Sequence, residues 1–131
     1  MRKEVMLKRI PAIAAVSIML VCAAVAGPAD DALQANLEGK YAKAYRILSS
    51  CAERDDGSCQ WLLGTYYENG RHVSRDLVVA YKWYALAPGA RKNPTSISAS
   101  ARDRIAKLMA PAEIDRARQL IRDWQKKKRP N

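Results

Sequence analysis

Apolar residues recur at helical spacing through the middle of the chain, in two segments that end at turn-forming residues. In residues 59–67 they lie three and four positions apart, and Gly70 follows as a stop signal. A second segment begins after Asp76, a residue type that favours the N-cap position, and reaches the Pro-Gly pair at 88–89. Apolar residues at this spacing occupy one face of an α-helix. The pattern predicts two antiparallel helices joined by a short loop, and an all-α fold.

Part of this helical pattern recurs with a period near 36 residues. Residues 44–48 read Ala-Tyr-Arg-Ile-Leu and residues 80–84 read Ala-Tyr-Lys-Trp-Tyr, while a weaker copy, Ala-Arg-Gln-Leu-Ile, occupies residues 117–121. Repeats of this length are typical of stacked helical hairpins, in which each unit buries its apolar face against the next. We therefore expect a short α-solenoid of antiparallel helix hairpins.

Ten residues of the middle unit fall at the spacing of a known repeat motif: Leu63, Gly64, Tyr67, Gly70, Val73, Asp76, Ala80, Trp83, Tyr84 and Ala87. This set resembles the consensus of the Sel-one-like repeat, a helical hairpin related to the tetratricopeptide repeat. The sequence departs from that consensus at His72, where the family normally has a second glycine, and at Pro88, where an alanine is usual. The resemblance implies stacked hairpins with a curved face that binds a segment of another protein.

Two of these positions carry specific expectations about the backbone. Gly64 lies inside a helix, where glycine costs about 1 kcal/mol relative to alanine. We expect that its missing side chain lets the partner helix approach closely. His72 stands in place of a loop glycine, and a positive φ at this position costs more for histidine than for glycine.

The repeat pattern and the family resemblance together divide the chain into segments. The first helix of the first unit is predicted from about Asp31 to Glu38. From the N-terminus we expect a signal peptide at 1–26, a helical repeat domain at 27–125 and a basic tail at 126–131. The repeat domain is expected to comprise a degenerate unit at about 30–57, the main unit at 58–89 and C-terminal capping helices at 95–125.

The first 26 residues have the layout of a secretory signal peptide. Basic residues at positions 2, 3, 8 and 9 precede an uncharged apolar stretch, which ends in Ala-Val-Ala before Gly27. A basic start, an apolar centre and a small-residue site are the three parts of such a leader. We expect cleavage and export to the bacterial periplasm or the medium. The alternative is an uncleaved leader that anchors the protein to the inner membrane.

The number of cysteines changes if the leader is removed. Cys22 lies in the leader, so a mature chain of 105 residues retains only Cys51 and Cys59. An even number of cysteines in an exported protein favours pairing. The two lie on either side of the turn at 55–57, opposite each other on adjacent antiparallel helices, and the secreted cysteine-rich branch of the family has a similar bridge. We expect a disulfide between them, and the alternative is two buried, reduced thiols.

The net charge of +10 is concentrated at the C-terminal end, since residues 27–90 carry −1 and residues 91–131 carry +8. The basic run after Trp124 comprises Lys126, Lys127, Lys128 and Arg129. It is interpreted either as a solvated tail or as a contact for an anionic membrane surface, where each Lys or Arg contributes roughly 1 kcal/mol. We expect no nucleic-acid partner, because the leader predicts export and the run lacks interleaved aromatic residues for base stacking.

Composition and motifs argue against most catalytic chemistry. The single histidine, His72, falls in a loop, and the sequence contains no G-x-S-x-G, H-E-x-x-H, S-x-x-K or glycine-rich phosphate-loop pattern. One histidine and three cysteines without finger-like spacing also argue against a metal site. We therefore expect no enzyme activity, no cofactor and no metal.

A recognition surface remains as the main functional hypothesis. On the predicted helix that begins near Cys59, the side chain of Trp61 projects away from the apolar face, so it is either an exposed anchor or packed on the neighbouring unit. The candidate partner-binding residues are Trp61, Thr65, Arg71 and His72. We interpret the chain as an exported, non-catalytic interaction module for an unidentified protein or peptide. The alternative is an envelope or membrane-surface protein that acts through its basic tail.

Overall fold

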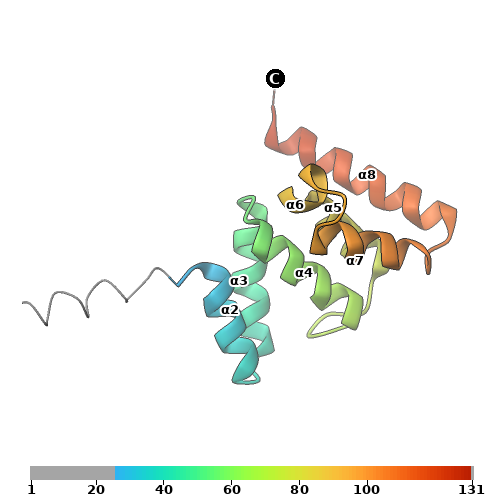
Figure 1. Cartoon of the computed structure of the whole chain (residues 1–131). Helices are drawn as coiled ribbons and strands as arrows, with labels where there is room; N and C mark the ends of the chain where they lie inside the picture. Colours follow the sequence, from blue (N-terminus) through green and yellow to red (C-terminus); the bar gives the residue numbers. More distant parts are fainter. Residues whose placement is uncertain (1–25, 131) are drawn as a thin grey trace, which may run out of the picture.

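The computed structural model describes residues 26–130, and this part of the chain contains seven α-helices and no β-strand (Figure 1). The helices are α2 (Pro28–Leu37), α3 (Tyr41–Glu53), α4 (Gly57–Asn69), α5 (Leu77–Leu86), α6 (Pro88–Lys92), α7 (Ile97–Ala106) and α8 (Pro111–Lys128). The predicted all-α class is therefore confirmed for the described residues. The expected signal peptide falls almost wholly on residues 1–25, which lie outside them.

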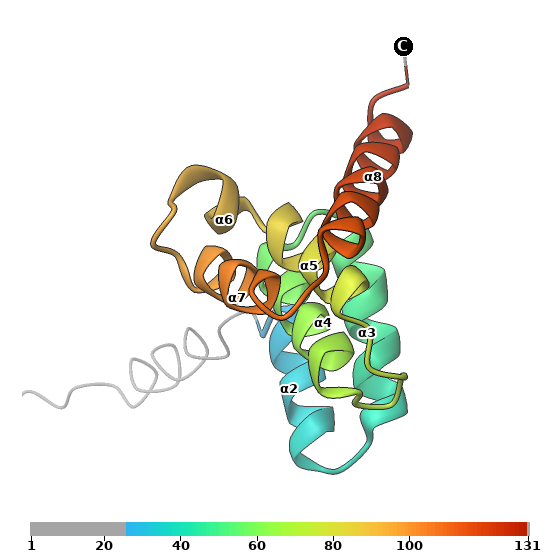
Figure 2. The ribbon, with the colours of Figure 1, turned by 90° about the vertical axis from the view of Figure 1, so that its right-hand side faces the viewer.

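The first four helices pack mainly on their neighbours in the chain (Figures 1 and 2). α3 packs against both α2 and α4, and α4 packs against both α3 and α5. The last two helices, α7 and α8, both pack against α5 and diverge from the short connection between them, as Figure 2 shows. α5 is therefore the element that joins the N-terminal helices to the C-terminal ones.

The ends of the middle two helices follow the signals in the sequence. Asp56 caps α4 by accepting a hydrogen bond from a backbone N–H of its first turn at 2.9 Å, and Gly70 ends the helix in the left-handed conformation at φ 64°. Asp76 caps α5 by accepting from two backbone N–H groups. His72 adopts φ 62°, so the connecting loop keeps a conformation that glycine would favour.

Three helix boundaries differ from the expectation. α2 begins at Pro28 rather than near Asp31, because the fixed φ of proline suits the first position of a helix. α5 ends before the Pro-Gly pair at 88–89, as expected, but this pair also begins a short helix, α6, that was not predicted. α8 runs to Lys128, so three of the four basic residues expected in a tail form the last helical turn.

Tertiary contacts explain why α8 extends so far. Trp124 is buried edge-to-face against Trp83 of α5, with ring centroids 6.4 Å apart. Its indole N–H donates a hydrogen bond to a carboxylate oxygen of Glu53 at 3.1 Å. Lys128 donates to the backbone carbonyl oxygen of the same residue, at the end of α3. These contacts hold the final turns of α8 on the domain.

The period found in the sequence corresponds to equivalent positions in the core. Ala44, Ala80 and Ala117 begin the three repeated segments, and each has an exposed fraction of 0%, on α3, α5 and α8 respectively. A small side chain at a buried position lets adjacent helices pack closely. The core consists of two apolar clusters, one formed mainly by α2, α3 and α4 and the other by α5, α7 and α8.

Gly64 provides the space in which α4 and α5 meet. A Cβ atom at this position would lie 2.6 Å from Cε1 of Tyr84, far inside van der Waals contact. The Tyr84 ring fills that space and is only 1% exposed. The predicted close approach of the two helices at Gly64 is therefore confirmed.

The connection between α3 and α4 is fixed by a disulfide bond between Cys51 and Cys59. Their Cα atoms are 5.8 Å apart, and both side chains are buried. Next to the bridge, the fully buried Gln60 donates a hydrogen bond from its side chain to the backbone carbonyl oxygen of Ala52 at 3.1 Å. The expected pairing is confirmed, and it joins the first pair of helices to the second.

We predict that Gly64→Ala lowers the free energy of unfolding by up to about 2 kcal/mol. Forcing a methyl group against the Tyr84 ring costs typically about 1–3 kcal/mol, and alanine regains roughly 1 kcal/mol of this in helix propensity. Urea unfolding measures the difference. Gly89→Ala is the control, since its Cβ would lie in ordinary contact, 3.5 Å from Cβ of Ser96. Equal effects of the two substitutions would contradict the close approach.

We predict that replacing both Cys51 and Cys59 by serine lowers the free energy of unfolding by about 2–3 kcal/mol, because the short closed loop restricts the unfolded chain. Urea unfolding of the double variant measures this loss. In the unreduced, unfolded wild-type chain, thiol labelling should modify only Cys22. Labelling of either paired cysteine would show that the bridge is absent.

Candidate functional site

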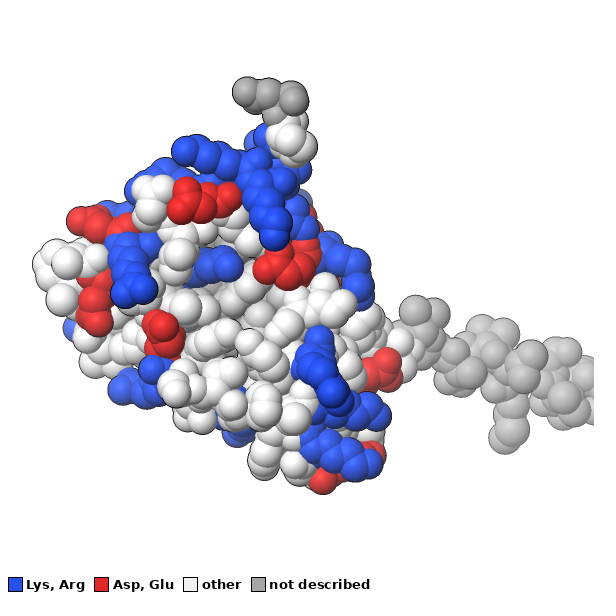
Figure 3. Space-filling model, turned by 180° about the vertical axis from the view of Figure 1, so that it is seen from behind, with Lys and Arg blue, Asp and Glu red and all other residues white. Residues whose placement is uncertain are grey.

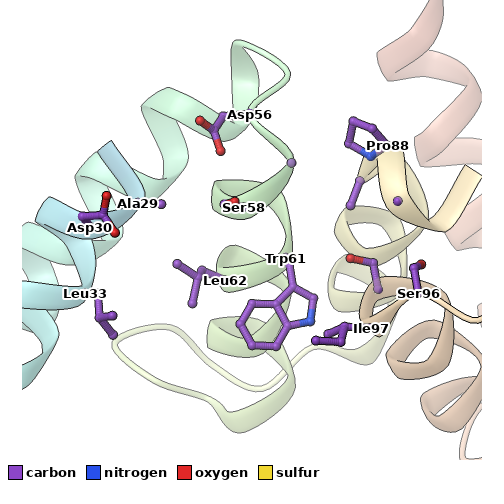
Figure 4. A pocket seen from close by; sticks show the side chains of 14 residues that line it. Ala29, Asp30, Leu33, Asp56, Ser58, Trp61, Leu62, Pro88, Ser96 and Ile97 are labelled. Carbon is purple, nitrogen blue, oxygen red and sulfur yellow. The ribbon is translucent and has the colours of Figure 1, made fainter. Parts of the chain in front are cut away.

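A groove opens between α2 and α7, with α4 as its floor and the start of α6 at one end (Figure 4). Its volume of about 800 Å³ is within the range of ligand-binding pockets. The first turns of all four helices face this space. The groove is lined by apolar side chains from each of them, including Leu33, Trp61, Leu62, Pro88 and Ile97. We refer to these five residues and the space between them as the α4 groove.

Trp61 is the largest side chain of the α4 groove. It is partly buried, because it packs against the second core cluster, formed by α5, α7 and α8. It also faces the groove (Figure 4). Its indole N–H is buried and has no hydrogen-bond acceptor among the described residues. Trp61 thus combines the two roles that the sequence left open, since it packs on a neighbouring element and lines a surface hollow.

The walls of the α4 groove expose large apolar side chains. Leu33 of α2 is 47% exposed, and Ile97 at the start of α7 is 70% exposed. The two lie on opposite sides of the groove, with Trp61 and Leu62 between them (Figure 4). Exposed apolar side chains that gather at a hollow are typical of recognition sites.

Polar groups at the rim of the groove fix the helix ends that form its walls. Asp30, Asp56 and Ser96 each accept a hydrogen bond from a backbone N–H at the start of α2, α4 and α7 respectively. These side chains satisfy N–H groups that have no partner within the helix. The rim is therefore polar, while the centre of the groove is apolar.

A second hollow, of about 480 Å³, continues from Trp61 and Ile97 along α4 and α7. Thr65, Glu68 and Arg104 contribute to its lining. Two of the predicted partner-binding residues, Trp61 and Thr65, therefore lie on one continuous surface along α4.

Glu68 links three helices beside this second hollow. Its carboxylate accepts a hydrogen bond from the hydroxyl of Tyr84 on α5 at 2.6 Å and two from the guanidinium of Arg104 on α7, at 2.5 and 3.0 Å. Hydrogen bonding to Arg104 is the main cause that lowers the pKa of Glu68, and Tyr84 acts in the same direction. Burial, together with the bond to Glu68, raises the pKa of Tyr84. The ionised carboxylate thus holds α7, one wall of the groove, in place.

The other two predicted partner-binding residues, Arg71 and His72, lie apart from the groove. The guanidinium of Arg71 is 5.5 and 5.8 Å from the ring centroids of Tyr41 and Tyr66. The ring of His72 is 5.3 Å from that of Tyr45. Neither residue lines the α4 groove or its continuation. Their contacts attach the loop between α4 and α5 to the aromatic side chains of its neighbours.

The basic residues at the end of α8 form a different surface. Lys128 and Arg129 line a small cavity of about 250 Å³ together with Arg91 of α6 and the edge of Trp124. This cavity shares no lining residue with the α4 groove. The structure therefore separates the predicted anionic-surface residues from the predicted partner-binding Trp61.

Within residues 26–130, no three His, Cys, Asp or Glu side chains come together as ligands for a metal ion. Over the same range, no helix combines the length and the apolar character needed to cross a membrane. The α4 groove offers apolar contact surface and one buried hydrogen-bond donor.

Sequence reasoning missed Leu33, Leu62, Pro88 and Ile97 as residues of the site. The one local signal for Ile97 is its position directly after the helix cap Ser96. An apolar residue in the first turn of a helix need not belong to the buried face, so this position is compatible with exposure at a site. Pro88 was expected only to end a helix. α5 does end before it, and Pro88 also begins α6 at the edge of the groove.

No protein-family model matches the chain, and no curated protein is similar enough to match it. The geometry of the α4 groove therefore carries the functional proposal.

We predict that Glu68→Gln weakens the fold at neutral pH and makes its stability less sensitive to acid. The pKa of Glu68 is lowered from 4.5 in the folded state. The Glu68 carboxyl therefore takes up its proton at a higher pH in the unfolded chain than in the folded protein. As a result, the stabilisation by this carboxylate is fully present above about pH 4.5 and is lost as the pH falls through the lowered pKa of the folded state. Urea unfolding at neutral and acidic pH measures both effects.

Glu38→Gln is the control for this prediction, because the Glu38 carboxylate forms an exposed ion pair with Lys40. Exposed pairs contribute only about 0–1 kcal/mol, so its removal should change stability little at either pH. If Glu68→Gln changed stability equally at neutral and acidic pH, the charge of Glu68 would not be the stabilising factor.

Proposed function

We propose that this chain is an exported, non-catalytic interaction module that binds an extended segment of a partner protein in the α4 groove. The bound segment places a large apolar side chain against Trp61, between Leu33 and Ile97. The observation that carries the proposal is the state of Trp61, whose ring lines an open groove while its buried N–H lacks an acceptor among the described residues.

The unpaired indole N–H favours a peptide as the ligand. A buried donor without an acceptor costs roughly 1–3 kcal/mol, and every residue of a peptide brings a carbonyl oxygen that can accept such a bond. The nitrogen edge of Trp61 lies on the side of Ile97 (Figure 4).

The dimensions of the surface also fit an extended segment. α4 contains 13 residues, which corresponds to about 20 Å of helix and to roughly six residues of an extended peptide. The α4 groove and its continuation both follow this helix. An apolar centre with a polar rim is the usual composition of a protein interface.

The finer fold assignment, a short Sel-one-like α-solenoid, is part of this proposal. Two observations support it. The buried alanines at the repeat period lie on α3, α5 and α8. The groove is lined mainly by α2, α4 and α7, the helices that directly precede these three, with α6 at one end. In helical repeats, successive units present corresponding helices to the same face.

Export is supported by the disulfide and by the N-terminal sequence. A buried disulfide in a small domain is typical of oxidising compartments. The layout of residues 1–26 is that of a secretory leader. We place the protein in the bacterial periplasm or outside the cell.

We predict that a peptide selected by display on the purified protein binds through the α4 groove. In titration calorimetry, Ile97→Ser should raise the Kd about tenfold, because it removes an apolar wall without disturbing the core. Trp61→Phe keeps an aromatic ring and removes the N–H donor, and it should raise the Kd by about the same factor.

Leu108→Ser is the matched control for this titration. Leu108 is 64% exposed, similar to Ile97, and lies outside the groove, so this variant should bind as the wild type does. Selected peptides that bind Ile97→Ser and Trp61→Phe with unchanged Kd would place the binding site elsewhere. A selection that returns no peptide would remove peptide binding as the function of the groove.

A further inference from the structure

Basic side chains from three helices gather where α8 ends. They come from α5, α6 and the last turn of α8 with its C-cap: Lys82, Arg91, Lys126, Lys127, Lys128 and Arg129. We refer to these six residues as the cationic corner. Figure 3 shows Lys and Arg side chains concentrated at this C-terminal end of the molecule.

Two packed tryptophans bring these side chains to one place. The rings of Trp83 and Trp124 are in edge-to-face contact. Nζ of Lys82 lies 4.0 Å from the centroid of the Trp83 ring, and Nζ of Lys128 lies 5.1 Å from that of Trp124. Arg91 lines the same small cavity as Lys128. The corner is therefore part of the folded domain and not only a terminal tail.

The charges of the cationic corner are poorly compensated. None of its six residues forms an ion pair with an acidic side chain of residues 26–130. The acidic neighbours are Glu53, whose carboxylate accepts a hydrogen bond from Trp124, Asp55 at the small cavity, and Asp123, one turn before Lys126 and Lys127 on α8. Burial is the main cause that lowers the pKa of Lys82, and the positive charge of Lys127 adds to it while Glu53 opposes it. An approaching anionic surface would relieve this mutual repulsion.

We propose that the cationic corner docks the protein on an anionic phospholipid surface. Its six cations are spread over three helices rather than directed at a single point, which suits a surface of many headgroups better than one bound phosphate. Each Lys or Arg close to such a surface strengthens binding about fivefold. Lipid docking leaves the α4 groove accessible, since the corner's small cavity and the groove share no lining residue.

The aromatic residues of the corner argue against nucleic acid as the partner. Trp83 and Trp124 are only 5% and 7% exposed, so their faces are inside the fold. Single-stranded nucleic acids bind largely through bases stacked on exposed aromatic rings. Here the rings position the lysines instead.

Co-sedimentation of the full-length chain with vesicles tests this proposal. Vesicles of phosphatidylcholine alone measure any contribution of apolar segments, and the additional binding to vesicles that also contain phosphatidylglycerol measures the basic side chains. Only those of the corner differ between the wild type and the corner variants, because residues 1–26 stay the same. The triple variant Lys126→Gln, Lys127→Gln, Arg129→Gln should lower that additional partition coefficient about 100-fold. The double variant Lys82→Gln, Arg91→Gln should lower it about 25-fold, whereas a role confined to the terminal residues would leave it unchanged.

The charge-matched control is the triple variant Lys40→Gln, Lys43→Gln, Arg46→Gln, which removes three positive charges near the opposite end of α3. It should bind anionic vesicles nearly as the wild type does, and circular dichroism should show that all variants are folded.

Equal binding of the wild type to neutral and anionic vesicles, or an equal loss in the control, would overturn the proposal. Displacement by inorganic phosphate at matched ionic strength would assign the corner to soluble phosphate instead. The Kd of a groove-bound peptide should not change in the corner variants, so the two functions can fail separately.

Discussion

The close approach of α4 and α5 at Gly64 is the constraint on which the rest of the structure depends. Because Gly64 has no side chain, the ring of Tyr84 lies directly against α4 and is almost completely buried. In this position its hydroxyl reaches Glu68, one turn further along α4, and the same carboxylate binds Arg104 of α7. One missing Cβ atom thus sets the positions of three helices relative to each other.

The two candidate binding surfaces follow from this arrangement. α4 is held by the disulfide on the side of α3 and by Glu68 on the side of α7, and its remaining face, with Trp61, becomes the floor of a groove. α8 packs on α5 through Trp124 and directs its basic last turn away from that groove. The structure thus keeps the apolar groove and the cationic end apart, and these are the surfaces that we propose for a partner protein and for an anionic membrane.

Features with local signals are predictable from the sequence, and features set by tertiary contacts are not. The stop at Gly70, the cap at Asp76 and the disulfide all depend on short segments, and the structure contains each of them. The final turn of α8 depends instead on the burial of Trp124, whose hydrogen-bond partner Glu53 lies 71 residues earlier in the sequence. At the site, helical spacing places Trp61 on the face of α4 that forms the groove. Its neighbour Ile97 belongs to α7, whose position is fixed by the contact between Arg104 and Glu68, and no sequence pattern indicates that contact.

The central claim is the contact between Gly64 and Tyr84, and proton NMR measures it most directly. The close approach predicts strong nuclear Overhauser effects between the Hα protons of Gly64 and the ring protons of Tyr84, because the Cβ position of Gly64 is 2.6 Å from Cε1 of that ring. It also predicts ring-current shifts of the Gly64 Hα protons. Their absence, with Gly64 resonances at ordinary helical values, would contradict this account of how α4, α5 and α7 are held together.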